Sequence, residues 1–191
     1  MSPSRSKRTH HSFGYVLFIH LTTGFSSSGV LALVSQQASV TGNISNLAIT
    51  PNGKFLFAVD DDTTVSAYAI DAVTGKLALI AGSPFAAGDQ PSTIAVDPSG
   101  RYVYAANQGS SDISAYSINA DGSLTAIAGS PFVTGTQPLQ ITVDPSGRFV
   151  YTANIGDSNI SVFIISSTTP GALSAVGAST AASPVFMTIT R

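Results

Sequence analysis

The chain has 191 residues, of which 43% are hydrophobic and only 9% are charged, whereas about 25% are charged in a typical soluble domain. This composition excludes a charge-rich disordered chain, and a formal net charge of -2 excludes a basic nucleic-acid-binding protein. Cysteine is absent, which excludes disulfides, thiolate metal sites and a cysteine nucleophile.

The N-terminal region is basic, and an apolar run follows it. Arg5, Lys7 and Arg8 precede the run, which extends from Phe13 to Leu21. A basic start before a short apolar core resembles a secretory signal, but no Ala-x-Ala cleavage site follows it. The alternative is a flexible basic segment, residues 1–12, joined directly to the first strand. No run of eighteen apolar residues occurs anywhere, so no membrane-spanning helix is expected.

A repeat of 47 residues organises the rest of the chain. Three turn motifs recur at this spacing: Pro-Asn-Gly-Lys at 51–54, Pro-Ser-Gly-Arg at 98–101, and Pro-Ser-Gly-Arg at 145–148. The segment Ala-Gly-Ser-Pro-Phe at 81–85 returns at 128–132, again 47 residues later. The period predicts three complete units, at residues 47–93, 94–140 and 141–187.

Each unit is predicted to contain four short strands. In the middle unit these strands are expected at residues 94–96, 102–105, 113–118 and 124–127. Asp97 to Gly100 has the chemistry of a type I turn, with Asp first, Pro second and Gly fourth. Asp121-Gly122 marks a hairpin between the last two strands. Gly129-Ser130-Pro131 is predicted to end the sheet and lead to the next unit.

Four strands repeated at this length are typical of a β-propeller blade. We predict an all-β propeller of four-stranded antiparallel blades of about 47 residues, with about four blades in one domain over residues 13–191. The fixed interval between turns argues against a β-sandwich. Residues 13–46 form a partial blade, which the C-terminal strand 185–191 is expected to complete, burying two sheet edges. An open arc that self-associates through its blade edges is the alternative.

The repeat also resembles a known family. Ile94 to Asn107, with the turn from Asp121 to Leu124, is similar to the seven-bladed lactonase-type propellers, which include 6-phosphogluconolactonase and the carboxy-muconate cyclising enzymes. Tyr104 to Asn107 and Tyr151 to Asn154 also resemble the YVTN-type repeats of bacterial surface proteins. The resemblance covers residues 15–191. The resemblance implies seven blades, a ligand site at the channel mouth and, in the enzymatic members, lactone chemistry. Because about four blades are predicted here, it also implies a partial or shortened member.

The residues that this resemblance implies for catalysis are largely missing. The resemblance implies that members acting on lactones use His, Arg and Glu side chains near the channel. The sequence has no Glu, and its histidines, His10, His11 and His20, precede the first complete blade. Arg101 and Arg148 follow repeated turns and are interpreted as solvated turn residues. Catalytic residues are therefore unknown. The chain is predicted to be a binding scaffold, and the alternative is a lactonase with an Asp as base, acting on a sugar lactone such as 6-phosphogluconolactone.

Polar residues end the second strands and precede the first strands of successive blades, so they are expected on one face. This face is predicted to bind a small polar ligand or a protein partner through seven residues: Asp60, Asp61, Asp62, Gln90, Asn107, Gln137 and Asn154. The alternative is that Asn and Asp here only terminate strands and form local turns.

No metal is expected, because the Asp triplet lacks the spacing of a calcium loop. No cofactor is expected either, and the sequence has no phosphate-binding loop of the Gly-x-x-x-x-Gly-Lys type. The low charge and the Ser/Thr/Ala/Gly-rich surface favour an exported bacterial protein over a cytoplasmic one.

Overall fold

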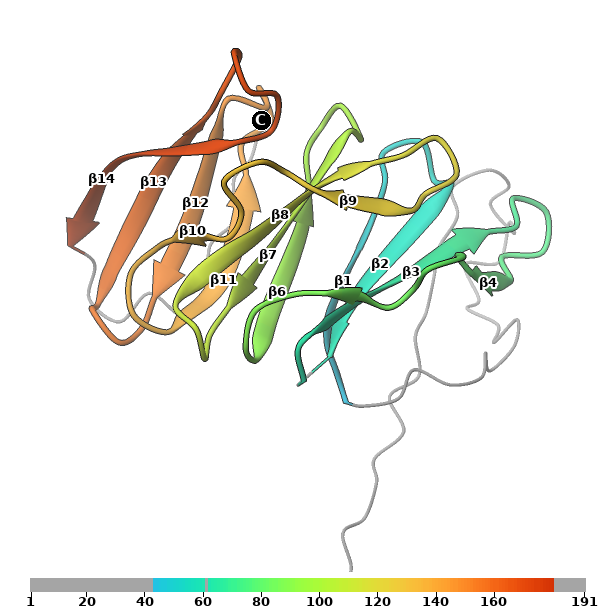
Figure 1. Ribbon diagram of the computed structural model, residues 1–191, viewed down its shortest axis with the longest axis horizontal. Helices are drawn as coiled ribbons and strands as arrows, with labels where there is room; N and C mark the ends of the chain where they lie inside the picture. The colour runs from blue at the N-terminus through green and yellow to red at the C-terminus, as the bar shows by residue number, and fades with distance from the viewer. Residues whose placement is uncertain (1–42, 61, 181–191) are drawn as a thin grey trace, which may run out of the picture.

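The computed structural model describes residues 43–60 and 62–180, and every regular element in them is a β-strand. These strands form three antiparallel sheets that follow one another in chain order (Figure 1). The first sheet contains β1 (Ile44–Ile49), β2 (Phe55–Asp60), β3 (Thr64–Ile70), β4 (Leu77–Leu79) and β5 (Phe85–Ala86). The second contains β6 (Pro91–Val96), β7 (Tyr102–Asn107), β8 (Asp112–Ile118), β9 (Leu124–Ala126) and β10 (Phe132–Val133). The third contains β11 (Pro138–Val143), β12 (Phe149–Asn154), β13 (Asn159–Ile165) and β14 (Leu173–Thr180).

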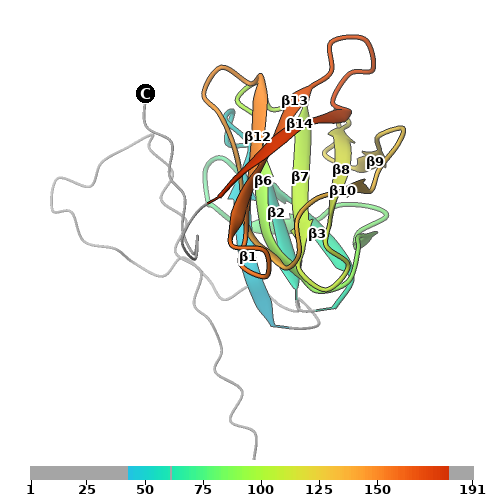
Figure 2. The same ribbon diagram turned by 90° about the vertical axis from the view of Figure 1, so that its left-hand side faces the viewer.

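Each sheet is one propeller blade, and the innermost strands β1, β6 and β11 are neighbours. Asn46 Oδ1 of β1 accepts a hydrogen bond from the Ile94 N–H of β6 at 3.4 Å. Thr93 Oγ1 of β6 accepts one from the Ile141 N–H of β11 at 2.9 Å. The view turned by 90° shows the sheets one behind another (Figure 2). The predicted all-β architecture of four-stranded antiparallel blades is therefore confirmed.

Three blades lie within the described residues, and their first strands begin 47 residues apart, at 44, 91 and 138. The partial blade predicted over residues 13–46 lies outside the described residues apart from the start of β1, and so does the strand predicted at 185–191. The completion of that blade by both chain ends stays a prediction. The described part of the chain contains no helix that is long and apolar enough to cross a membrane.

Apolar side chains fill the space between successive sheets. Phe57 of the first sheet packs in one cluster with Val103 of the second, and both are fully buried. Tyr104 of the second sheet packs in another cluster with Val150 and Phe163 of the third. Because each sheet is apolar on both faces, stacking is what buries it, as expected for repeated blades.

The turn between the first and second strands forms as predicted. The Gly100 N–H donates to the Asp97 carbonyl at 2.9 Å, and Gly100 has a φ of 69°. Asp97 Oδ1 accepts hydrogen bonds from the N–H groups of Arg101 and Tyr102, both at 2.8 Å. The carboxylate thus satisfies the main-chain donors at the start of β7, which explains why Asp-Pro-Ser-Gly recurs.

One prediction about the outer strand is wrong. Gly129-Ser130-Pro131 does not end the sheet, because the chain returns as β10, which pairs with β8. Ser130 makes this return possible, since its Oγ accepts a hydrogen bond from the Ala115 N–H of β8 at 2.9 Å. Ser83 does the same for Ala67 in the first blade. A serine hydroxyl thus replaces a missing main-chain acceptor between the two halves of the outer strand.

Candidate functional site

The loops after the second strands and the links between blades meet at one end of the sheets. The link before β6 is held on one side by the Gln90 N–H, which donates to the Asp62 carbonyl at 3.0 Å. On its other side the Gly109 N–H donates to the Asp89 carbonyl at 2.9 Å. A Cβ on Gly109 would lie only 3.0 Å from that carbonyl oxygen, so glycine allows the close approach.

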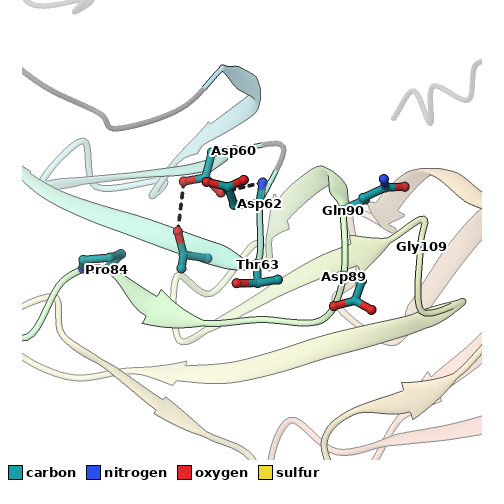
Figure 3. Close-up of a pocket in the computed structure, with 8 residues that line it drawn as sticks. Asp60, Asp62, Thr63, Pro84, Asp89, Gln90 and Gly109 are labelled. Atoms are coloured by element: carbon teal, nitrogen blue, oxygen red, sulfur yellow. Dashed lines mark hydrogen bonds between the residues drawn. The ribbon is translucent and has the colours of Figure 1, made fainter.

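A hollow of about 660 Å³ opens beside this link (Figure 3). Asp60 and Asp62 lie on one side of it, and Asp89 and Gln90 lie on the other. Asp62, Asp89 and Gln90 are exposed, so their carboxylate and amide groups are available to a ligand. Eight residues line the hollow: Asp60, Asp62, Thr63, Thr64, Pro84, Asp89, Gln90 and Gly109.

Asp60 differs from the other two carboxylates because it is only 3% exposed and already hydrogen-bonded. Its Oδ1 accepts from the Asp62 N–H at 3.2 Å, and its Oδ2 accepts from the Thr64 hydroxyl at 2.9 Å. In the next blade the polarity is reversed, since Asn107 Nδ2 donates to Asp112 Oδ1 at 2.6 Å. The hydrogen-bonded pair Asp60–Thr64 of the first blade thus takes the place of the pair Asn107–Asp112 of the second. We therefore assign Asp60 the role of stabilising its loop.

Asn107 and Asn154, at the ends of β7 and β12, are both 0% exposed. Each lies beneath a glycine of the preceding link. A Cβ on Gly88 would lie 2.6 Å from Asn107 Nδ2, and a Cβ on Gly135 would lie 2.4 Å from Asn154 Nδ2. These asparagines therefore shape the loops, and the structure gives them no open surface toward a ligand. The repeated Gly at 88 and 135, each 19 residues before the Asn, was the sequence signal for this burial.

The remaining predicted residues are separated. Gln137 occupies in the second link the place that Gln90 has in the first, and the two share a left-handed backbone with φ values of 54° and 51°. Gln137 is exposed but does not line the hollow. Asp61 lies outside the described residues. Five of the eight lining residues were not predicted from the sequence: Thr63, Thr64, Pro84, Asp89 and Gly109.

Asn107 carries one unsatisfied group, because its Oδ1 is buried without a hydrogen-bond partner. In the next blade the Thr134 hydroxyl lies 3.5 Å from Asn154 Oδ1, and Ala87 occupies the position equivalent to Thr134. Ala87→Thr is therefore expected to raise the free energy of unfolding by about 1 kcal/mol. Urea denaturation followed by circular dichroism measures this change. Thr134→Ala should lower it, because it also removes the hydrogen bond of 2.6 Å between the Thr134 and Thr152 hydroxyls. Destabilisation by Ala87→Thr would contradict the prediction.

Charge is distributed unevenly between the two ends of the sheets. The carboxylates of the hollow have no basic residue beside them. The described residues contain no group of three or more Asp or His side chains that could hold a metal ion. Such a hollow favours hydroxyl donors and cations and repels anions. The Lys and Arg residues that the structure describes all lie in turns at the opposite end: Lys54, Lys76, Arg101 and Arg148.

A family model described as "Lactonase, 7-bladed beta-propeller" matches residues 18–128 and 81–189 of the sequence. The chain belongs to this lactonase propeller family. The two matches overlap over residues 81–128, and the predicted resemblance is confirmed. No curated protein matches the sequence significantly.

Solved structures resembling this lactonase-family chain include two putative 6-phosphogluconolactonases. The one from Bacteroides uniformis has a TM-score of 0.72 and 22% identity, covering 85% of this chain and 48% of that chain. The one from Bacteroides fragilis has a TM-score of 0.64 and 24% identity, covering 73% and 39%. A periplasmic gluconolactonase from Pseudomonas aeruginosa has a TM-score of 0.61 and 20% identity, covering 72% and 39%. At these identities the likeness shows the fold, and the chain spans less than half of each structure.

Proposed function

We propose that the hollow beside Asp62 and Asp89 binds an uncharged polyhydroxyl compound of the size of a sugar, and that this lactonase-family segment is a binding scaffold. One observation carries the proposal: the exposed side chains of Asp62, Asp89 and Gln90 offer acceptor oxygens on opposite sides of one hollow, and no Lys or Arg lines it. Carboxylate and amide oxygens accept hydrogen bonds from hydroxyl groups, and bonds to a charged acceptor are the stronger ones.

The same electrostatics argue against a phosphorylated substrate. A phosphate in the hollow would face the carboxylates of Asp62 and Asp89 without a compensating Lys or Arg. Hydrolysis of a lactone also needs a group that stabilises the developing oxyanion, and none of the three lining carboxylates can supply it. Binding of a neutral sugar requires neither a cation nor an oxyanion hole.

Isothermal titration calorimetry with two matched sugars tests the proposal. We expect D-glucose to bind at least about 5-fold more tightly than D-glucose 6-phosphate, because the phosphate adds like-charge repulsion worth about 1 kcal/mol or more. Asp62→Asn should weaken glucose binding and reduce the discrimination against the phosphate. Asp121→Asn, at the opposite end of the sheets, is the matched control and should change neither. Equal or tighter binding of the phosphate would contradict the proposal.

Lactone hydrolysis is the second candidate, favoured by the family and by the exposed Asp62 carboxylate, which could act as a general base toward water. Hydrolysis of glucono-1,5-lactone, followed by acid release in weak buffer, distinguishes the two functions. A scaffold leaves the spontaneous rate unchanged. An acceleration that Asp62→Asn removes and Asp121→Asn retains would replace the scaffold with a lactonase.

A further inference from the structure

The outer strand of the third blade is built differently from those of the first two. In the first blade it is divided into β4, with 3 residues, and β5, with 2 residues, and in the second blade β9 and β10 repeat this division. In the third blade β14 is one continuous strand of 8 residues, paired with β13 along its length. The Gly-Ser-Pro return is absent, and a single bulged residue, Val176, remains in its place.

Within residues 43–60 and 62–180, no strand pairs with the outer edge of this continuous strand. Among the described residues, β13 is the one strand that pairs with β14, so β14 ends the third sheet. Seven of its eight residues are exposed, and Val176 is 62% exposed. Proteins usually protect such an edge with a proline, a lysine, a short strand or a β-bulge. The strand Leu-Ser-Ala-Val-Gly-Ala-Ser-Thr has 8 residues, no proline and no lysine, and the bulge at Val176 is the one device of this kind that it contains.

The main-chain groups on this edge are arranged to accept another strand. The Ser166 N–H donates to the Ala172 carbonyl at 2.8 Å, which fixes the alternation of hydrogen bonds along the ladder. In an antiparallel ladder every second residue directs its N–H and C=O away from the partner. Leu173 and Ala175 are therefore the residues before the bulge whose main-chain groups point outward.

We infer that β14 pairs antiparallel with β14 of a second copy of the chain, joining two third blades into one continuous sheet. A two-fold axis near the middle of the strand brings Val176 of one copy beside Val176 of the other, and the contact is self-complementary. No residue of β14 is charged, so identical strands meet without repulsion. The small side chains of Ser174, Ala175 and Ala178 offer no pocket that would select a foreign peptide. This inference is independent of the proposed sugar site.

Sedimentation equilibrium of the full chain over a range of concentrations tests the inference. The wild-type chain is expected to show a reversible monomer–dimer equilibrium, because the contact is smaller than a standard stable interface. Val176→Lys should raise the dissociation constant about 10-fold or more, since like charges directly opposite across strands repel. Val73→Lys is the matched control, because Val73 is 94% exposed and lies in the turn between β3 and β4.

A mixing experiment separates strand pairing from general loss of folding. Val176→Lys and Val176→Asp should each dimerise about 10-fold more weakly than the wild type when alone, and should form a heterodimer more strongly than either homodimer when mixed. Hydrogen exchange of the full wild-type chain should show β14 amides protected more strongly at high concentration. A chain that is monomeric at every concentration, or a dimer that Val176→Lys and Val73→Lys weaken equally, would overturn the inference.

Discussion

Tyr104→Ala is expected to lower the free energy of unfolding by about 3–5 kcal/mol, the range for removing a large buried side chain. Tyr104 is 0% exposed and packs between the second and third sheets. Its hydroxyl donates to the Gly171 carbonyl at 3.0 Å, across to the third blade. The substitution therefore removes both apolar contacts and the partner of a carbonyl group. The midpoint of urea denaturation, followed by circular dichroism, measures the loss.

The repeat supplies the control for this prediction. Tyr151 occupies the same place in the third blade, but it is only partly buried, because no described sheet packs on that face. Tyr151→Ala should therefore cost clearly less than Tyr104→Ala. Tyr104→Phe isolates the hydrogen bond and should cost about 1 kcal/mol. Equal losses for the two alanine variants would mean that Tyr151 is as well packed as Tyr104.

The blades could be predicted from the sequence because their determinants are local. Every group that this turn uses lies between Asp97 and Tyr102, so the repetition of the Asp-Pro-Ser-Gly motif indicated the period and the strand order. The return of the outer strand could not be predicted in this way. It depends on a hydrogen bond between Ser130 and Ala115, 15 residues apart, and a Gly-Ser-Pro sequence looks the same whether a sheet ends or continues.

The candidate site could be predicted only in part, for a related reason. Strand ends placed Asp60, Asp62 and Gln90 on one face, and the hollow includes all three. The exposure of each side chain depends on segments that are distant in sequence. Asn107 is buried because Gly88 lies over it, while Asp62 is exposed. The loop between β2 and β3 has 3 residues, whereas the loop between β7 and β8 has 4. The shorter loop follows Asp60 and the longer one follows Asn107, so this local difference accompanies the exchange of Asn for Asp.

Asp144→Ala is expected to lower the free energy of unfolding at neutral pH by about 2–3 kcal/mol, as for loss of hydrogen bonds to a charged group. Asp144 Oδ1 accepts from the Arg148 and Phe149 N–H groups at 2.8 and 2.7 Å. Its Oδ2 accepts from the Ser146 N–H at 3.0 Å and from the Ser146 hydroxyl. Alanine leaves the main-chain donors at the start of β12 without this acceptor. Ser146→Ala keeps the carboxylate and should cost less.

The effect of Asp144→Ala should depend on pH in a defined direction. Burial of the Asp144 carboxyl opposes its ionisation, but the hydrogen bonds from Ser146, Phe149 and Arg148 outweigh burial and lower its pKa below the ordinary 3.8. A carboxyl whose pKa is lower in the folded state stabilises the fold fully above the unfolded pKa, and this contribution is lost as the pH falls through the folded pKa. The difference between wild type and Asp144→Ala in urea denaturation should therefore be constant from pH 7 to about pH 5 and shrink below pH 4. A difference that stays the same at pH 3 would mean that the carboxylate is not the group that holds this turn.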